Sequence, residues 1–138
     1  MKPLPKTENS LVLRTDFADA LAWSDICLEI QQPVGEFRAY VECVSDPVYD
    51  GLQPKQLITA SALGPYRAYV FIVDRTTFTH PEHPILVLDL QSEPGRTFRV
   101  IPPEMWAVEN NLSLANMDFE EFADAVDNDG IFRGFREN

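Results

Sequence analysis

Two uninterrupted apolar runs constrain the fold of this chain more than any other feature. Ala68–Val73 and Ile85–Leu88 are rich in β-branched residues, and every residue in both runs is apolar. Because a strand points successive side chains to opposite faces of a sheet, a strand that is apolar throughout is covered on both faces. The pattern predicts that both runs are central strands of a sheet with helices on both sides.

The flanking segments predict the rest of an α/β (α+β) fold. Further strands are expected at Leu11–Arg14, at the alternating residues 37–43 and at Thr97–Ile101. Helices are expected in four segments: after a cap at Asp16 or Asp19, over residues 54–63, after Pro102 and Pro103, and from Asp118 to a stop at Gly130. The order predicts a five-stranded mixed sheet with two crossover helices and two C-terminal helices. Its first three strands are expected to be parallel, and its last two to form a hairpin.

The length of 138 residues fits a single domain, which we expect over residues 11–138. Residues 1–10 mix proline, charged and polar side chains without periodicity, and they are expected to be a flexible lead-in. No run is long enough for a membrane helix and no secretory signal is evident, so a cytoplasmic location is expected. Cys27 and Cys43 fit neither a disulfide framework nor a metal site, and both are expected to be buried small hydrophobes.

A net charge of −11 opposes binding to nucleic acid, since affinity for a phosphate backbone comes from lysine and arginine. Nine acidic residues against two arginines lie in residues 104–138. The helix predicted from Asp118 carries an apolar face at Phe119, Phe122, Ala123 and Val126. Its outer face is formed by Glu120, Glu121, Asp124 and Asp127.

The leading hypothesis is a non-enzymatic protein-interaction or regulatory domain whose acidic helix face binds a basic partner. The alternative for this face is simple solvation, because acidic proteins gather such surfaces for solubility. A homodimer through Phe132 and Phe135 is a further possibility, although docking of these side chains on their own core explains them equally well.

The competing hypothesis is a small-ligand or magnesium site at the carboxyl ends of the strands, where open α/β sheets bind ligands. The candidate residues are Arg14, Asp16, Asp46, Asp74, Arg75 and His80. The structural alternative is that these aspartates cap helices and form Asx turns.

Other motifs are incomplete, because residues that they require are missing at specific positions. His80 and His83 have a spacing seen in zinc sites but no evident further ligands, so a turn is the simpler interpretation. The Asp127–Gly130 segment would begin a calcium loop only with ligands at Ala125 and Arg136. Nucleotide-binding and hydrolase motifs are absent from the sequence, so no cofactor is predicted and enzymatic function is disfavoured.

Four segments together resemble a bacterial family catalogued only as a domain of unknown function. They are Phe37–Leu52 (FRAYVECVSDPVYDGL), Thr79–Leu90 (THPEHPILVLDL), Glu93–Ile101 (EPGRTFRVI) and Asn110–Phe135 (NNLSLANMDFEEFADAVDNDGIFRGF). The resemblance covers nearly the whole chain after Ser10. It implies a bacterial, cytosolic, single domain and assigns no catalytic residues.

Overall fold

The computed structural model describes residues 1–136, which form one six-stranded mixed sheet in the order β2-β1-β3-β4-β5-β6. The strands are β1 (Ser10–Arg14), β2 (Val41–Val44), β3 (Tyr69–Val73), β4 (Ile85–Asp89), β5 (Thr97–Val100) and β6 (Ile131–Phe132). β1 pairs in parallel with β2 and β3, whereas β3–β4 and β4–β5 are antiparallel. The parallel trio and the β4–β5 hairpin are thus confirmed.

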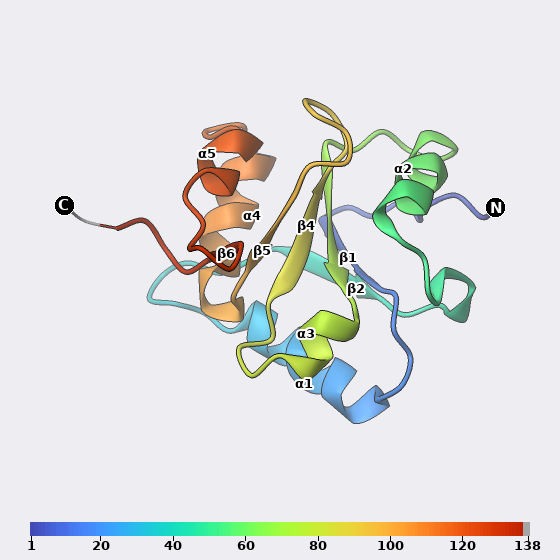
Figure 1. Cartoon of the computed structure of the whole chain (residues 1–138), viewed down its shortest axis with the longest axis horizontal. Helices are drawn as coiled ribbons and strands as arrows, with labels where there is room; N and C mark the ends of the chain where they lie inside the picture. The colour runs from blue at the N-terminus through green and yellow to red at the C-terminus, as the bar shows by residue number, and fades with distance from the viewer. Residues whose placement is uncertain (137–138) are drawn as a thin grey trace.

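Helices cover both faces of the sheet (Figure 1). They are α1 (Ala20–Gln31), α2 (Pro54–Ala62), α3 (Arg75–Thr79), α4 (Met105–Ser113) and α5 (Phe119–Ala123), with 3-10 turns η1 (Pro47–Tyr49) and η2 (Pro102–Glu104). α1, α4 and α5 pack on one face, and α2 with η1 packs on the other. From β1 the chain crosses to β2 in one direction, and from β2 it crosses past β1 to β3 in the other direction. Because such crossovers are right-handed in both directions, α1 and α2 lie on opposite faces of the sheet.

The two apolar runs form β3 and β4 at the centre of the sheet, as predicted. Phe71 and Val73 point to the side of α1, α4 and α5, and Val70 and Ile72 point to the side of α2. All four are at most 1% exposed. Successive side chains of each strand thus enter two separate cores, which explains why neither strand has a polar residue in its interior.

The last part of the chain differs from the prediction. The capping box between Asp118 and Glu121 forms as expected, but α5 ends at Ala123. The chain then turns, with Gly130 at a φ of 81° and the Asp127 N–H donating to Ile131 O at 2.9 Å. It returns as β6, a sixth strand that pairs in parallel with β5. A strand of two residues has no periodicity that a sequence pattern could reveal.

The first ten residues also depart from the expected flexible lead-in. Leu4 is 1% exposed and belongs to the core beneath α2, and the Tyr49 hydroxyl donates to Pro3 O at 2.6 Å. Gly64 allows this close approach, because a Cβ there would lie 2.9 Å from Leu4 O. The segment is therefore packed against α2 before it enters β1.

Candidate functional site

The carboxyl ends of β1, β2 and β3 meet at one edge of the sheet, but only part of the predicted strand-end set gathers there. Asp16, Asp74 and Arg75 line a cavity of about 330 Å³ together with Thr15 and the segment that leads into α2. Arg14, Asp46 and His80 do not line it.

Those three side chains contact other groups of the protein instead. Asp46 accepts from Lys2 Nζ at 2.7 Å and from Val48 N at 3.0 Å, which caps η1. His80 Nδ1 accepts from Glu82 N at 3.0 Å. The Arg14 guanidinium lies over the ring of Phe17, with 4.3 Å between its Cζ and the ring centroid.

Asp74, which does line the cavity, also binds other groups of the protein. Both of its oxygens accept from Arg99, at 2.9 Å from Nη1 and 2.8 Å from Nη2, and Oδ1 accepts from Thr77 N at the start of α3. Within residues 1–136, no group of three or more His, Cys, Asp or Glu side chains is arranged to hold a metal ion. The described aspartates thus act as caps and ion-pair partners, which was the structural alternative for this set.

The predicted acidic face is smaller than the sequence suggests, because α5 is short. Glu121 accepts from Asp118 N as part of the capping box, and Asp124 pairs with Arg96. Asp127 lies beyond the helix, where it binds Arg133 and Arg136. Glu120 and Glu121 are both exposed on α5, and Glu121 is the one that takes part in the cap.

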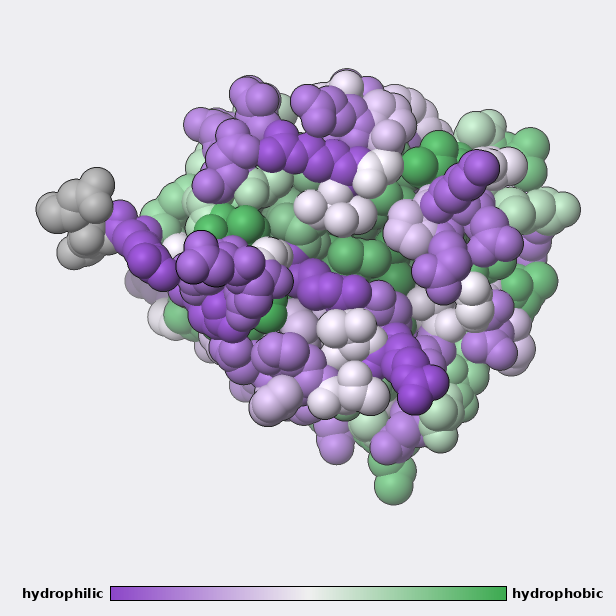
Figure 2. All heavy atoms as spheres, in the orientation of Figure 1, coloured by the Kyte–Doolittle hydropathy of each residue, from purple (hydrophilic) through white to green (hydrophobic). Residues whose placement is uncertain are grey.

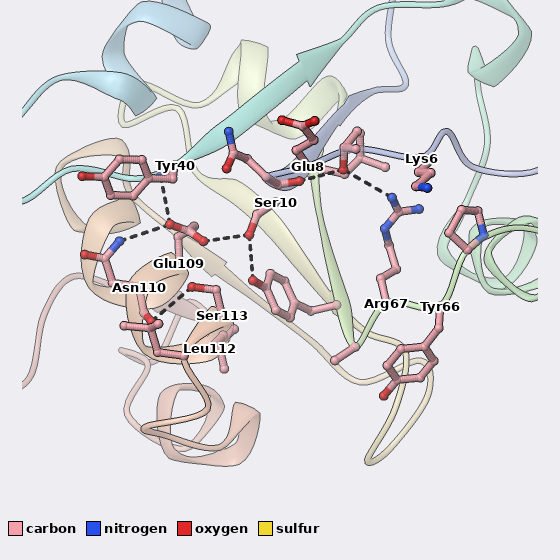
Figure 3. A pocket seen from close by; sticks show the side chains of 17 residues that line it. Lys6, Glu8, Ser10, Tyr40, Tyr66, Arg67, Glu109, Asn110, Leu112 and Ser113 are labelled. Atoms are coloured by element: carbon pink, nitrogen blue, oxygen red, sulfur yellow. Dashed lines mark hydrogen bonds between the residues drawn. The ribbon is translucent and has the colours of Figure 1, made fainter.

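A larger cavity, of about 640 Å³, lies at the opposite edge of the sheet (Figure 3). We call it the amino-end cavity, because Ser10 and Tyr69 at the starts of two parallel strands form its floor. Its walls come from α4, from the segment before β1 and from the turn before β3. None of its polar residues was a candidate from the sequence.

A buried carboxylate forms one end of this cavity. Glu109 is 2% exposed and accepts from Ser10 Oγ at 2.7 Å, from Tyr40 N at 2.8 Å and from Asn110 Nδ2 at 3.1 Å. The Ser10 and Tyr69 hydroxyl oxygens lie 2.7 Å apart. Since the single hydroxyl hydrogen of Ser10 goes to Glu109, Tyr69 is the donor to Ser10. The result is a hydroxyl chain that runs from Tyr69 through Ser10 to Glu109.

Glu109 is unusual because every group that binds it is neutral. Burying a carboxylate is costly unless hydrogen bonds or a positive charge compensate it. Burial also raises the pKa of Tyr69, which keeps its hydroxyl protonated at the end of the chain. This end of the cavity is thus an electronegative site fronted by hydroxyl groups.

An arginine with spare donor capacity forms the other end. Arg67 Nη2 donates to Pro5 O at 2.7 Å, while Nη1 is buried and has no hydrogen-bond partner in residues 1–136. Burial lowers the pKa of Arg67, whose ordinary value is high enough that it keeps its charge. Figure 3 shows this side chain across the cavity from Glu109, with Lys6 and Tyr66 beside it.

The sequence did contain a signal for Glu109. Met105, Val108, Glu109 and Leu112 stand at i, i+3, i+4 and i+7, so the acid occupies a core position of an apolar helix stripe. Arg67 had no comparable signal, because its partner Pro5 lies in a segment whose packing depends on Leu4 and Gly64.

Comparison with known proteins agrees with the resemblance described above. The family model described as "Domain of unknown function (DUF6924)" matches residues 9–135. A search of curated proteins found no match. None of the helices within residues 1–136 combines the length and the apolar character that crossing a membrane requires.

Proposed function

This chain belongs to the family of domains of unknown function matched above, and we propose that it is a small-molecule-binding domain whose site is the amino-end cavity. The observation that carries this proposal is the buried Arg67 Nη1, which lacks a hydrogen-bond partner within residues 1–136. Leaving a buried donor unpaired costs about 1–3 kcal/mol, more when the group is charged. Because Nη1 is closed off from the cavity in this conformation, a ligand oxygen would remove that cost once the Arg67 side chain turns Nη1 toward the cavity.

The two ends of the cavity specify the ligand's chemistry. A carboxylate or phosphate group fits Arg67, because a guanidinium binds such groups with two parallel hydrogen bonds. Lys6 adds a second positive charge on the wall formed by the segment before β1, and Glu8 on the same wall adds a negative one (Figure 3). At the other end, the Tyr69–Ser10–Glu109 chain favours an ammonium or another hydrogen-bond donor. We therefore propose a small zwitterionic ligand, such as a free amino acid or a short peptide.

Apolar side chains support a ligand of this size. Tyr66 and Leu114 line the cavity and are 77% and 70% exposed. Tyr66 lies at the Arg67 end of the cavity and Leu112 at the Glu109 end (Figure 3). Most of the other lining residues are polar or charged, so this cavity suits a polar ligand that keeps a small apolar contact.

Thermal melts with a panel of amino acids, simple carboxylates and phosphate monoesters test this proposal. A probe at a hundred times its Kd adds about 2.7 kcal/mol to the free energy of unfolding, so a ligand of the right class raises the Tm by several degrees. We expect amino acids or dipeptides to raise the Tm of the wild type. R67Q should abolish the response, whereas the control K55Q, on the outside of α2, should respond like the wild type.

Glu109→Gln distinguishes the two ends. The amide can keep the bonds from Tyr40 N and Asn110 and can donate to Ser10, but it removes the negative charge. We expect the preference for amino acids over simple carboxylates to disappear in this variant. The proposal fails if no probe raises the Tm, or if R67Q responds as strongly as the wild type.

We also propose, as a second candidate, that the acidic surface around α5 binds a basic protein. Its support is Phe135, a 53% exposed aromatic side chain that lines a hollow of about 760 Å³ together with Asp124, Asp127 and Asp129. Hydrophilic atoms gather over α5 and the C-terminal segment in Figure 2. Arg133 and Arg136 line the same hollow and pair with Asp127, so a lysine or arginine of the partner would have to contact the exposed ring and compete with these arginines for the carboxylates.

Charge reversal at Glu120 tests the second candidate without breaking the ion pairs of Asp124 and Asp127. We expect E120K to lose at least half of the captured basic partner in an affinity capture from native extract, and the captured complex to dissociate as salt is raised. The control D25K reverses an exposed acid on α1. Equal recovery by E120K and the wild type would contradict this candidate.

A further inference from the structure

Ser10 lies on the floor of the amino-end cavity, between a hydrogen-bond acceptor and a hydrogen-bond donor. Its Oγ donates to Glu109 Oε2 at 2.7 Å and accepts from the Tyr69 hydroxyl, whose oxygen is 2.7 Å away. Figure 3 shows the three side chains meeting at the Ser10 oxygen. A hydroxyl oxygen has two lone pairs, and within residues 1–136 only Tyr69 donates to this one. The second lone pair is therefore available to attack an electrophile bound in the cavity.

Glu109 is placed as a base for this serine. Its Oε1 accepts from Tyr40 N at 2.8 Å and from Asn110 Nδ2 at 3.1 Å, which leaves Oε2 to Ser10. The bonds to Oε1 fix the orientation of the carboxylate, and its place on the buried side of α4 keeps it 2% exposed. A serine that is hydrogen-bonded to a base, which other groups orient in turn, has the arrangement that activates a nucleophile for covalent catalysis.

Tyr69 is placed to stabilise the charge that an attack by Ser10 creates. When Oγ bonds to a carbonyl carbon, the carbonyl oxygen becomes an oxyanion on that same carbon. The Tyr69 hydroxyl already lies at hydrogen-bond distance from Oγ, so a small rotation turns its O–H to the oxyanion. A donor aimed at such developing charge is worth about 10²–10³ in rate.

We propose that the amino-end cavity hydrolyses short peptides, with Ser10 as the nucleophile, Glu109 as the general base and Tyr69 as the oxyanion donor. This inference rests on the proposed function, because the carboxyl end of the substrate is the group that Arg67 binds. The amino end of the substrate then lies near Glu109, and a peptide carbonyl between the two ends meets Ser10. The substrate class is therefore a short peptide with both ends free.

The reaction consumes one water molecule for each peptide bond. Ser10 Oγ attacks the carbonyl carbon while its proton passes to Glu109 Oε2. The C–N bond then breaks, Glu109 gives the proton to the leaving amine, and the acyl group remains on Ser10 as an ester. Water attacks this ester and loses a proton to Glu109, the C–Oγ bond breaks, and the proton returns to Ser10. The products are a carboxylic acid and an amine, and no electrons are exchanged with a cofactor.

A fluorophosphonate probe tests Ser10 directly, because its phosphorus is attacked by a nucleophilic serine with loss of fluoride and without any contact to Arg67. We expect intact mass and peptide mapping to show one probe per wild-type chain, on Ser10. S10A should take up no probe, and E109Q should react at least about a hundredfold more slowly, the usual effect of losing a general base. The control S24A removes an exposed hydroxyl on α1 and should react like the wild type.

A panel of dipeptides tests the substrate class, with the released amino acids as the measurement. The wild type should cleave members of this panel, and Y69F should cleave them at least about a hundredfold more slowly because it lacks the oxyanion donor. Circular dichroism checks that each variant folds.

The Tm responses described above separate this inference from the proposed function. A wild type that responds to amino acids in the melt but takes up no probe overturns the hydrolytic inference alone. Probe uptake on Ser10 without a Tm response or dipeptide cleavage overturns the proposed ligand, and the substrate class with it. The inference is also overturned if S10A takes up the probe as fast as the wild type, or if E109Q reacts at the wild-type rate.

Discussion

Phe122→Ala is expected to destabilise the protein by about 3–5 kcal/mol, the range for truncating a fully buried aromatic side chain. Phe122 is 0% exposed, and its ring centroid lies 5.2 Å from that of Phe132 and 6.2 Å from that of Phe98. A helix as short as α5 has no stability of its own in water, so this packing is what holds it. The measurement is urea unfolding followed by circular dichroism.

Phe135→Ala is the matched control. Its ring contacts Phe122 and Phe132 from the outside and is 53% exposed, so we expect a loss of about 1 kcal/mol. Equal losses for the two variants would mean that the aromatic cluster is not centred on α5. A loss below about 1 kcal/mol for Phe122→Ala would contradict its place in the core.

Asp74→Ala is expected to lower the free energy of unfolding by about 3 kcal/mol. This is the low end of the range for breaking a buried ion pair, because both side chains retain some exposure. The substitution leaves the Arg99 guanidinium, 20% exposed, without its anion and removes the cap of α3. The double variant Asp74→Ala/Arg99→Met should recover part of this loss, since no charge then remains unpaired. Asp25→Ala, at an exposed position on α1, should change stability by less than about 0.5 kcal/mol.

The same pair predicts a pH dependence. Burial alone raises the pKa of Asp74, but Arg99 and Thr77 outweigh it and hold the pKa below its ordinary value. The stabilisation from Asp74 is therefore complete above the unfolded pKa, about 3.9, and is lost as pH falls through the lower folded value. Asp74→Asn should show a shallower acid limb in a plot of unfolding free energy against pH. An unchanged limb would mean that Asp74 does not contribute.

The parts of the fold that followed from sequence are those set by local pattern. The apolar runs at residues 68–73 and 85–88 placed β3 and β4 at the centre of the sheet, because covering both faces leaves no other position. The Asp118–Glu121 capping box was equally local. β6 was missed because its pairing with β5 depends on a turn at Gly130 that brings together residues about thirty positions apart.

The candidate site was harder to predict for a different reason. The parallel order of the first three strands was predicted correctly, so their carboxyl ends do meet at one edge of the sheet. Asp46 and Asp74, however, are paired with Lys2 and Arg99, and no pattern along the chain reveals these two pairs. Glu109 was overlooked because a glutamate on a helix is ordinarily exposed. Its position on the apolar stripe of α4 was the available signal. Arg67 needed the packed conformation of residues 3–7 to be recognised.

The packed lead-in also has a consequence for the proposed site. Residues 6–9 line the amino-end cavity, and Pro5 O accepts from Arg67, so one wall of the proposed site is a strip held by Leu4 in the core and by the bond from Asn9 N to Glu42 Oε2. Loss of residues 1–5 would remove Leu4 from the core beneath α2 as well as the acceptor of Arg67 Nη2, so it would change both the packing of α2 and that wall of the cavity. Recombinant versions that start at β1 would therefore lack part of the proposed site.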